Sequence, residues 1–290
     1  MDLLNTLYNL MSLVCVLGTM ASMGLSLTIA QITGPLRNAR FVIVALLANF
    51  VVPPILAFIL IQLFSLDEPL AVGLTLVSLA AGAPALPKTA VFAKIDAAAA
   101  TGLTVLLVVV TILILPIALP LLLTGISVTF WDIASGLIIL ILIPLAVSLF
   151  VRARYPKAAA SALPHFAQAS NLSLLILLVL MVVLNFSDVV GLLGSGGLLA
   201  SLILVILTTA GGYLLGKLGK AVGWIQALGA GQRNIAAAMV VATMNFGNDE
   251  IVMVVVYSLI VMVILIPLAL ELGKRAGAAA AEAKVETPAN

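Results

Sequence analysis

The chain has 290 residues, of which 64% are apolar and only 8% are charged, and its mean hydropathy is +1.33. These values exclude a soluble domain, because about a quarter of the residues in an average soluble protein are charged and cover its surface. The formal net charge of +2, without a basic stripe, argues against nucleic-acid binding. The apolar runs are continuous and of helical length, so we expect an all-α membrane protein rather than a β-barrel.

The predicted elements are about nine transmembrane helices, since a bilayer core takes roughly 20 apolar residues as a helix. We treat the first as a retained helix and not a signal peptide, because Asp2 is the only charge before it. Residues 1–275 would form one transmembrane domain, and the polar, Ala-rich residues 276–290 a flexible cytoplasmic tail. In chain order the helices span approximately 6–31, 40–64, 69–95, 98–123, 133–151, 166–186, 196–216, 222–246 and 250–272.

The charges between these helices indicate their direction in the membrane. Loops with Lys and Arg alternate with loops that hold only acidic charges, and positive residues stay on the cytoplasmic side. We therefore predict a multi-pass protein of the cell inner membrane, with the N-terminus outside and the C-terminus cytoplasmic. The basic loops contain Arg37, Arg40, Lys94, Arg152, Arg154, Lys157, Lys217, Lys220, Lys274 and Arg275, and the acidic loops contain Asp67, Glu68, Asp132, Asp188, Asp249 and Glu250.

Two basic residues, Lys88 and Arg233, remain inside predicted helices. A charge at the bilayer centre costs at least a few kcal/mol on insertion scales, so such residues are seldom without a role. For Lys88 the alternative is a side chain that reaches back to the membrane surface along its apolar stem. Both residues nevertheless lie beside residues that interrupt helices, which favours a functional role.

The interruptions are predicted at Pro84 and Pro87 in one helix and at Gly229 and Gly231 in another. Proline removes a backbone donor, and paired glycines weaken a helix. At about 1.5 Å per residue, both breaks lie roughly 10–12 Å from the cytoplasmic end, in helices of opposite direction. We therefore expect two discontinuous helices that cross at their breaks, which is typical of the binding site in secondary transporters.

At these residues the chain resembles the bile acid:sodium symporter family. The resemblance implies two inverted repeats and a panel domain that moves against a core domain containing the two crossing helices. It assigns the spans near 6–31, 133–151 and 166–186 to the panel and the other six to the core. The matching stretches are Met23–Leu27, Asn49–Pro53, Leu70–Leu74, Gly212–Gly216 and Gly231–Ala237.

The sodium ligands that the resemblance implies are mostly replaced in this chain. No metal site is therefore expected, and we hypothesise that Lys88 and Arg233 take the structural place of two sodium ions. Three energy sources stay open: a proton carried by Lys88, exchange or uniport, and sodium at a remodelled site of backbone carbonyls with Thr104. Leu86 and Pro87 stand where the family has Ser and Asn, Ala100 stands for Ser, Gly229 for Glu and Arg233 for Gln, whereas Thr104 and Asn234 are kept.

These residues predict a transporter for a small organic anion, a carboxylate or sulfonate, that works by alternating access. Arg233 would hold the anion through two parallel hydrogen bonds. The alternatives are a sodium-coupled symporter with remodelled sites and an anion-sensing or channel-like protein. An enzyme is not expected, because the spans lack clustered acid, base or metal-binding groups. Apart from the anion, the expected partner is the lipid bilayer, without nucleic acid or organic cofactor, and the oligomeric state stays open. The predicted substrate-binding residues are Lys88, Arg233, Asn234, Gln232, Pro84, Thr89, Thr104 and Asn171.

Overall fold

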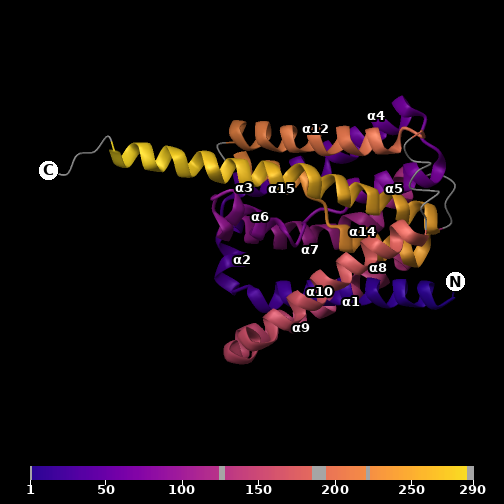
Figure 1. The fold of residues 1–290 in the computed structure, drawn as a ribbon, viewed down its shortest axis with the longest axis horizontal. Helices are drawn as coiled ribbons and strands as arrows, with labels where there is room; N and C mark the ends of the chain where they lie inside the picture. Colours follow the sequence, from indigo (N-terminus) through magenta and orange to yellow (C-terminus); the bar gives the residue numbers. More distant parts are fainter. Residues whose placement is uncertain (1, 124–127, 185–193, 220–222, 286–290) are drawn as a thin grey trace.

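The computed structural model describes residues 2–123, 128–184, 194–219 and 223–285. Across these ranges the regular structure is helical, without a strand, which confirms the predicted all-α class (Figure 1). Six of the described helical segments are long and apolar enough to cross a membrane. Large apolar side chains lie exposed on them, with 61% of Phe58, 62% of Leu113 and 72% of Val263 accessible, as expected for surfaces that face lipid.

The first half of the chain departs from the prediction at its first helix. A single span was expected at 6–31, but the helix ends at Ser26 and a second begins at Ile29. Thr28 starts this second helix, since its N–H and its hydroxyl both donate to Gln31 Oε1 at 2.9 Å. The helices are α1 (Asp2–Ser26), α2 (Ile29–Leu36), α3 (Ala39–Phe50), α4 (Val52–Phe64), α5 (Glu68–Leu79), α6 (Leu86–Phe92) and α7 (Ala97–Leu122).

In the second half, α8, η1 and α9 form one continuous segment with a π-helical turn at its centre. The wider turn comes directly before Pro144, which has no N–H to donate along the helix. The last helix runs to Val285, so part of the expected tail is helical. The elements are α8 (Phe130–Leu137), η1 (Ile138–Leu142), α9 (Ile143–Arg154), α10 (Pro156–Leu184), α12 (Gly197–Leu218), α13 (Gly223–Gly231), α14 (Ile235–Asn245) and α15 (Asn248–Val285).

The count of nine spans stays a prediction. Two of the nine, at 69–95 and 222–246, are interrupted helices in the structure, formed by α5 with α6 and by α13 with α14. A third, at 166–186, lies within α10 but ends outside the described residues. Two ranges agree closely with observed helices, 98–123 with Ala97–Leu122 and 196–216 with Gly197–Leu218, whereas the range 250–272 lies in a helix that runs on to Val285.

Two packed groups of helices organise the molecule. Helix α1 packs against α9 and α10, and these three are called the α1 group. The contact with α10 is tight, because a Cβ at Gly18 would lie 3.2 Å from the Ser170 nitrogen. Helices α3–α7 and α12–α15 pack around the two interruptions and are called the crossing group. In Figure 1 the α1 group lies along the lower side, and its helices overlap the ranges assigned from the sequence to a panel domain, an assignment that stays a prediction.

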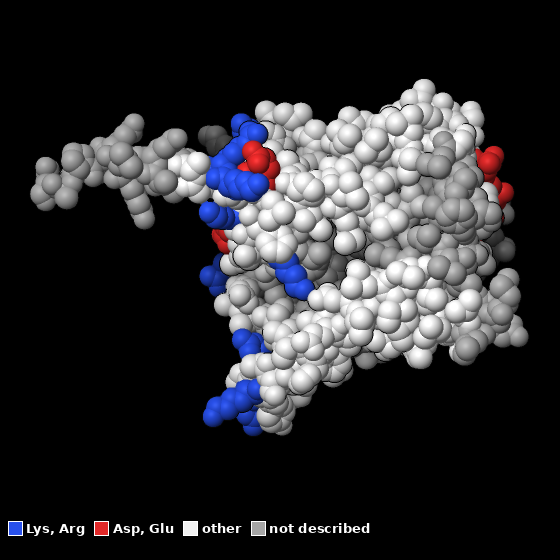
Figure 2. Space-filling view, viewed as in Figure 1, with Lys and Arg blue, Asp and Glu red and all other residues white. Residues whose placement is uncertain are grey.

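Charged side chains gather at the two ends of the molecule. In Figure 2, Lys and Arg lie at the end from which α15 projects, and basic surface reaches the edge of a hollow above α9. The opposite end shows only Asp and Glu in this view. This separation agrees with the alternation of basic and acidic loops in the sequence. Lys220 and Asp188, which belong to that pattern, lie outside the described residues.

Candidate functional site at two interrupted helices

The first interruption separates α5 from α6 over residues 80–85, which include Pro84, whereas Pro87 lies in the first turn of α6. Gly82 has a φ of +85°, and a Cβ there would lie 2.6 Å from the Val108 nitrogen. Glycine is therefore required both by the left-handed backbone and by the approach of α7. Thr111 on α7 satisfies the exposed backbone of Ala81, since its Oγ1 donates to the Ala81 carbonyl and accepts from the Ala81 N–H, both at 3.0 Å.

The second interruption covers residues 232–234, between α13 and α14. The predicted break residues lie just before it: Gly229 is inside α13, and Gly231 is its last residue. Asn234 starts α14 as its N-cap, with Oδ1 accepting from the Ala237 N–H at 3.0 Å.

The two interruptions are joined directly. The N–H of Asn234 donates to the carbonyl of Ala80 at 2.8 Å. A backbone group of the second interruption thus supplies the hydrogen-bond partner that the first interruption lacks. A second bond joins side chains, since Gln232 Nε2 donates to Thr89 Oγ1 at 2.8 Å. Segments about 150 residues apart in sequence thus meet at one point within the crossing group.

Arg233 lies at this meeting point and is only 2% exposed. Its Nε donates to the Val77 carbonyl at 2.9 Å. Its Nη2 donates to the carbonyls of Ser78 and, at 3.1 Å, Asn49. Its Nη1 reaches Asn49 Oδ1 at 3.4 Å and the Ala230 carbonyl at 3.5 Å. A guanidinium has five N–H groups, and this arrangement occupies all of them.

These carbonyls are free because each belongs to a helix that stops or bends. Val77 and Ser78 lie in the last turn of α5, and Ala230 lies in the last turn of α13, where no later N–H continues the helix. Asn49 would normally accept from the residue four positions later, but that residue is Pro53, which has no N–H. Arg233 therefore caps the C-terminal ends of α3, α5 and α13 together.

This geometry changes the role expected for Arg233. A helix C-terminus carries roughly half a negative charge, so three of them surround this one cation. A buried charge is tolerated when it is fully hydrogen-bonded, as it is here. No N–H of the guanidinium is left for the two parallel bonds to a carboxylate that the sequence led us to expect.

Three other predicted residues are not brought to this meeting point by any hydrogen bond. Lys88 is exposed on α6, and no hydrogen bond or ion pair joins it to another residue in the described part of the chain. Thr104 is buried in α7 and donates to the Ala100 carbonyl of its own helix at 2.9 Å. Asn171 is exposed on α10, in the α1 group.

Two polar atoms at the interruptions have no hydrogen-bond partner among the described residues. They are Oε1 of Gln232 and Nδ2 of Asn234, and both side chains are buried. A buried polar group without a partner is unfavourable, and at a candidate site it points to a missing ligand or water. The interruptions thus retain one free acceptor and one free donor.

Sequence reasoning missed several residues that complete the site. The carbonyls of Val77 and Ser78 carry no side-chain signature, so no pattern could have identified them. Tyr257 is fully buried in α15, and its hydroxyl donates to the Gly231 carbonyl at 3.4 Å. Pro53 was a usable signal for Asn49, because a proline predicts a free carbonyl four residues earlier.

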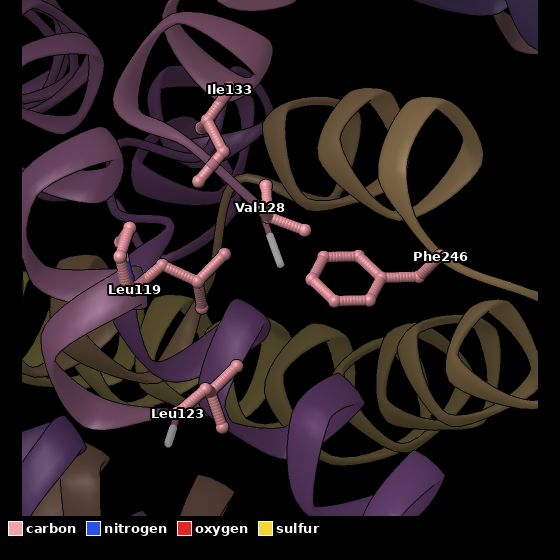
Figure 3. A pocket seen from close by; sticks show the side chains of 6 residues that line it. Leu119, Leu123, Val128, Ile133 and Phe246 are labelled. Atoms are coloured by element: carbon pink, nitrogen blue, oxygen red, sulfur yellow. The ribbon is translucent and has the colours of Figure 1, made fainter. Parts of the chain in front are cut away.

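A small apolar pocket lies elsewhere, where α7 ends and α8 begins (Figure 3). Phe246 closes it just beyond the end of α14, about 16 Å from that helix's start at about 1.5 Å per residue. Its side chains offer no polar group to an anion, so it is not the candidate site. The lining residues are Leu119, Pro120, Leu123, Val128, Ile133 and Phe246.

Comparison with known proteins adds an independent result. A model of the sodium bile acid symporter family matches residues 13–192, which is more than half of the chain and includes the first interruption. A search of curated proteins found no match. Members of the matching family are transporters and not enzymes, and the apolar helices agree with a membrane protein. The chain therefore belongs to the sodium bile acid symporter family.

Proposed function

We propose that the protein is a secondary transporter that moves a small organic anion, a carboxylate or sulfonate, across the membrane by alternating access. Family membership supports transport. The observation that carries the proposal is the direct junction of two interrupted helices, through the bond from the Asn234 N–H to the Ala80 carbonyl. Irregular backbone at membrane depth is tolerated only where it is enclosed by protein or lines a cavity, and such breaks form transporter binding sites.

The moving parts in this proposal are the α1 group and the crossing group. The α1 group packs mainly within itself, and Figure 2 shows a hollow above α9 at the basic end. Rocking of the α1 group would expose the interruptions first to one side of the membrane and then to the other. Two inverted repeats are supported by the order of elements, since each interrupted pair is preceded and followed by long helical segments.

The anion would bind at the interruptions once the α1 group has moved to expose them. Lys88 offers a positive charge that no described residue neutralises, and Asn234 Nδ2 offers a free donor. The first turn of α14 adds the positive end of a helix dipole. The binding site would also be lined by Pro84, Thr89 and Gln232. Asn171 on α10 would add a polar side chain from the α1 group, and Thr104 would add one from α7. Arg233 would attract the anion through its field without contacting it.

The orientation in this proposal has the basic end in the cytoplasm. The C-terminus would then be cytoplasmic and the N-terminus outside, in a cell inner membrane. The proposal is supported by the Lys and Arg at the end from which α15 projects (Figure 2).

Transport into proteoliposomes tests the proposal, with labelled taurocholate and labelled pantoate as probes of a sulfonate and a carboxylate. We expect saturable uptake of at least one probe by the wild-type protein. Lys88→Gln should reduce uptake at least tenfold, since one close charge–charge contact is worth about 1.4 kcal/mol or more. Lys94→Gln, which removes an exposed charge just beyond α6, is the matched control and should retain uptake. Equal uptake by both variants would contradict the role of Lys88, and failure of the wild-type protein to move either probe would contradict the proposed substrate class.

A further inference from the structure

We infer that Arg233 is a built-in cation that holds three helix ends together and replaces a dissociable metal ion, so that the protein needs no sodium for stability or transport. The part that concerns transport rests on the proposed function. The part that concerns stability does not, because it follows from the contacts of the guanidinium alone.

The contacts of Arg233 form a set of oxygen ligands. Five oxygen atoms converge on the guanidinium: the carbonyls of Val77, Ser78, Asn49 and Ala230, and Oδ1 of Asn49. Carbonyl and amide oxygens are the donors that hard cations prefer in proteins. A set of this kind, turned inward and away from water, favours a positive charge at its centre.

The electrostatics at this point also favour a cation. All four residues that supply the oxygens are uncharged, and the negative potential comes from the C-terminal ends of α3, α5 and α13. No group of three or more His, Cys, Asp or Glu that could bind a metal gathers in the described ranges. The positive charge of Arg233 is therefore balanced by backbone dipoles, as the charge of a carbonyl-bound ion would be.

A covalently attached cation has a different consequence from a bound one. A dissociable ion would assemble the interruptions only when it is present, and transport would depend on its concentration. Arginine keeps its charge at all accessible pH values and cannot leave. The three helix ends therefore stay joined in every step of transport, and only the α1 group needs to move.

Lys88 differs from Arg233 in each of these respects. It is exposed, and it makes no hydrogen bond or ion pair within the described part of the chain. The two basic residues of the predicted spans thus have different roles. Arg233 is a positioning residue that holds the helix ends, and Lys88 is free to bind the substrate.

Thermal unfolding of the purified protein in detergent tests the inference, in sodium chloride against choline chloride of equal concentration. The wild-type protein should have the same Tm in both salts. Arg233→Gln keeps a polar side chain but removes the charge, and it should lower Tm in choline and regain part of the loss in sodium, because the freed oxygens then bind the ion. Arg233→Lys, which keeps the charge, should lower Tm less and without a difference between the salts.

Three results would overturn the inference. The first is a wild-type protein that sodium stabilises. The second is an equal loss for Arg233→Gln in both salts, which would indicate that Arg233 acts by packing alone. The third is an equal Tm for Arg233→Gln and Arg233→Lys. None of these results bears on whether the protein carries anions, so failure here is distinct from failure of the proposed function.

Discussion

Single side chains in this protein satisfy backbone that the interruptions leave exposed. Thr111 comes from α7, Tyr257 from α15 and Arg233 from the second interruption, and each bonds a carbonyl near a helix end. The carbonyls from Leu76 to Ala81 all accept a hydrogen bond, from backbone N–H groups, Arg233 or Thr111. In a membrane every backbone polar group needs a hydrogen-bond partner within the protein, because no surrounding water can replace a lost one.

Replacing Thr111 with Val should therefore destabilise the protein. The change leaves the Ala81 carbonyl buried without a partner, at about 1–3 kcal/mol for an unsatisfied group, and leaves the Ala81 N–H only its bond to the Leu79 carbonyl at 3.1 Å. Thr101→Val is the matched control in the same helix, since Thr101 donates only to the Ala97 carbonyl of its own helix. Thermal unfolding should show a clear loss for Thr111→Val and a small one for Thr101→Val, and the reverse order would contradict the role of Thr111.

At the scale of elements, the positions of helix ends could be predicted from the sequence, whereas the groups that hydrogen-bond to those ends could not. Helix α7 was placed within one residue at each end, and the interruptions were located to within a few residues, because proline and glycine act locally. The break between α1 and α2 was missed, since Leu27 and Thr28 lie within an apolar run that favours a continuous helix.

The partners of Arg233 could not be predicted for a different reason. Val77, Ser78 and Ala230 contribute main-chain oxygens, and any residue type at those positions presents the same atom. The sequence identifies a buried cation and suggests its depth. It does not say whether the cation faces a cavity or a set of carbonyls, because this depends on how three helices pack.

Helix α12 packs closely against α13, the helix that ends at the second interruption. Glycine allows this close approach because it has no side chain. A Cβ at Gly212 would lie 2.5 Å from the Gln226 carbonyl oxygen, whereas a Cβ at Gly211 would meet only Val52 Cγ1 at 3.3 Å. Gly212→Ala should push the helices apart at a cost of about 1–3 kcal/mol. Gly211→Ala is the control and should be tolerated, since a side chain can move. Equal Tm values for the two variants would contradict this packing.

At the scale of the molecule, the two ends differ in the sign of their charged side chains, and the helices form two separately packed groups. The α1 group lies along one side of the crossing group, with a hollow at the basic end (Figures 1 and 2). The first feature could be anticipated from the loop charges, whereas the division into a panel and a core domain that the family resemblance implies stays a prediction. Their combination places the hollow on the side that we propose to be cytoplasmic.

Labelling of introduced cysteines tests this orientation. In a Cys15→Ser background, Lys157→Cys lies in the first turn of α10 and Asp67→Cys lies between α4 and α5, and both positions are exposed. A membrane-impermeant maleimide added to intact cells should label the residue 67 variant only. Permeabilised cells should show labelling of both. Labelling of the residue 157 variant in intact cells would contradict the proposed topology.

The most direct test of an anion carrier with a built-in cation is counterflow in a medium without sodium. Proteoliposomes are loaded with unlabelled taurocholate or pantoate in choline chloride, and the labelled compound is added outside. A carrier with a built-in cation should accumulate label transiently, to the same extent as in sodium chloride, whereas a channel should not. Absence of counterflow in both salts would contradict the carrier, and counterflow only with sodium would contradict the built-in cation.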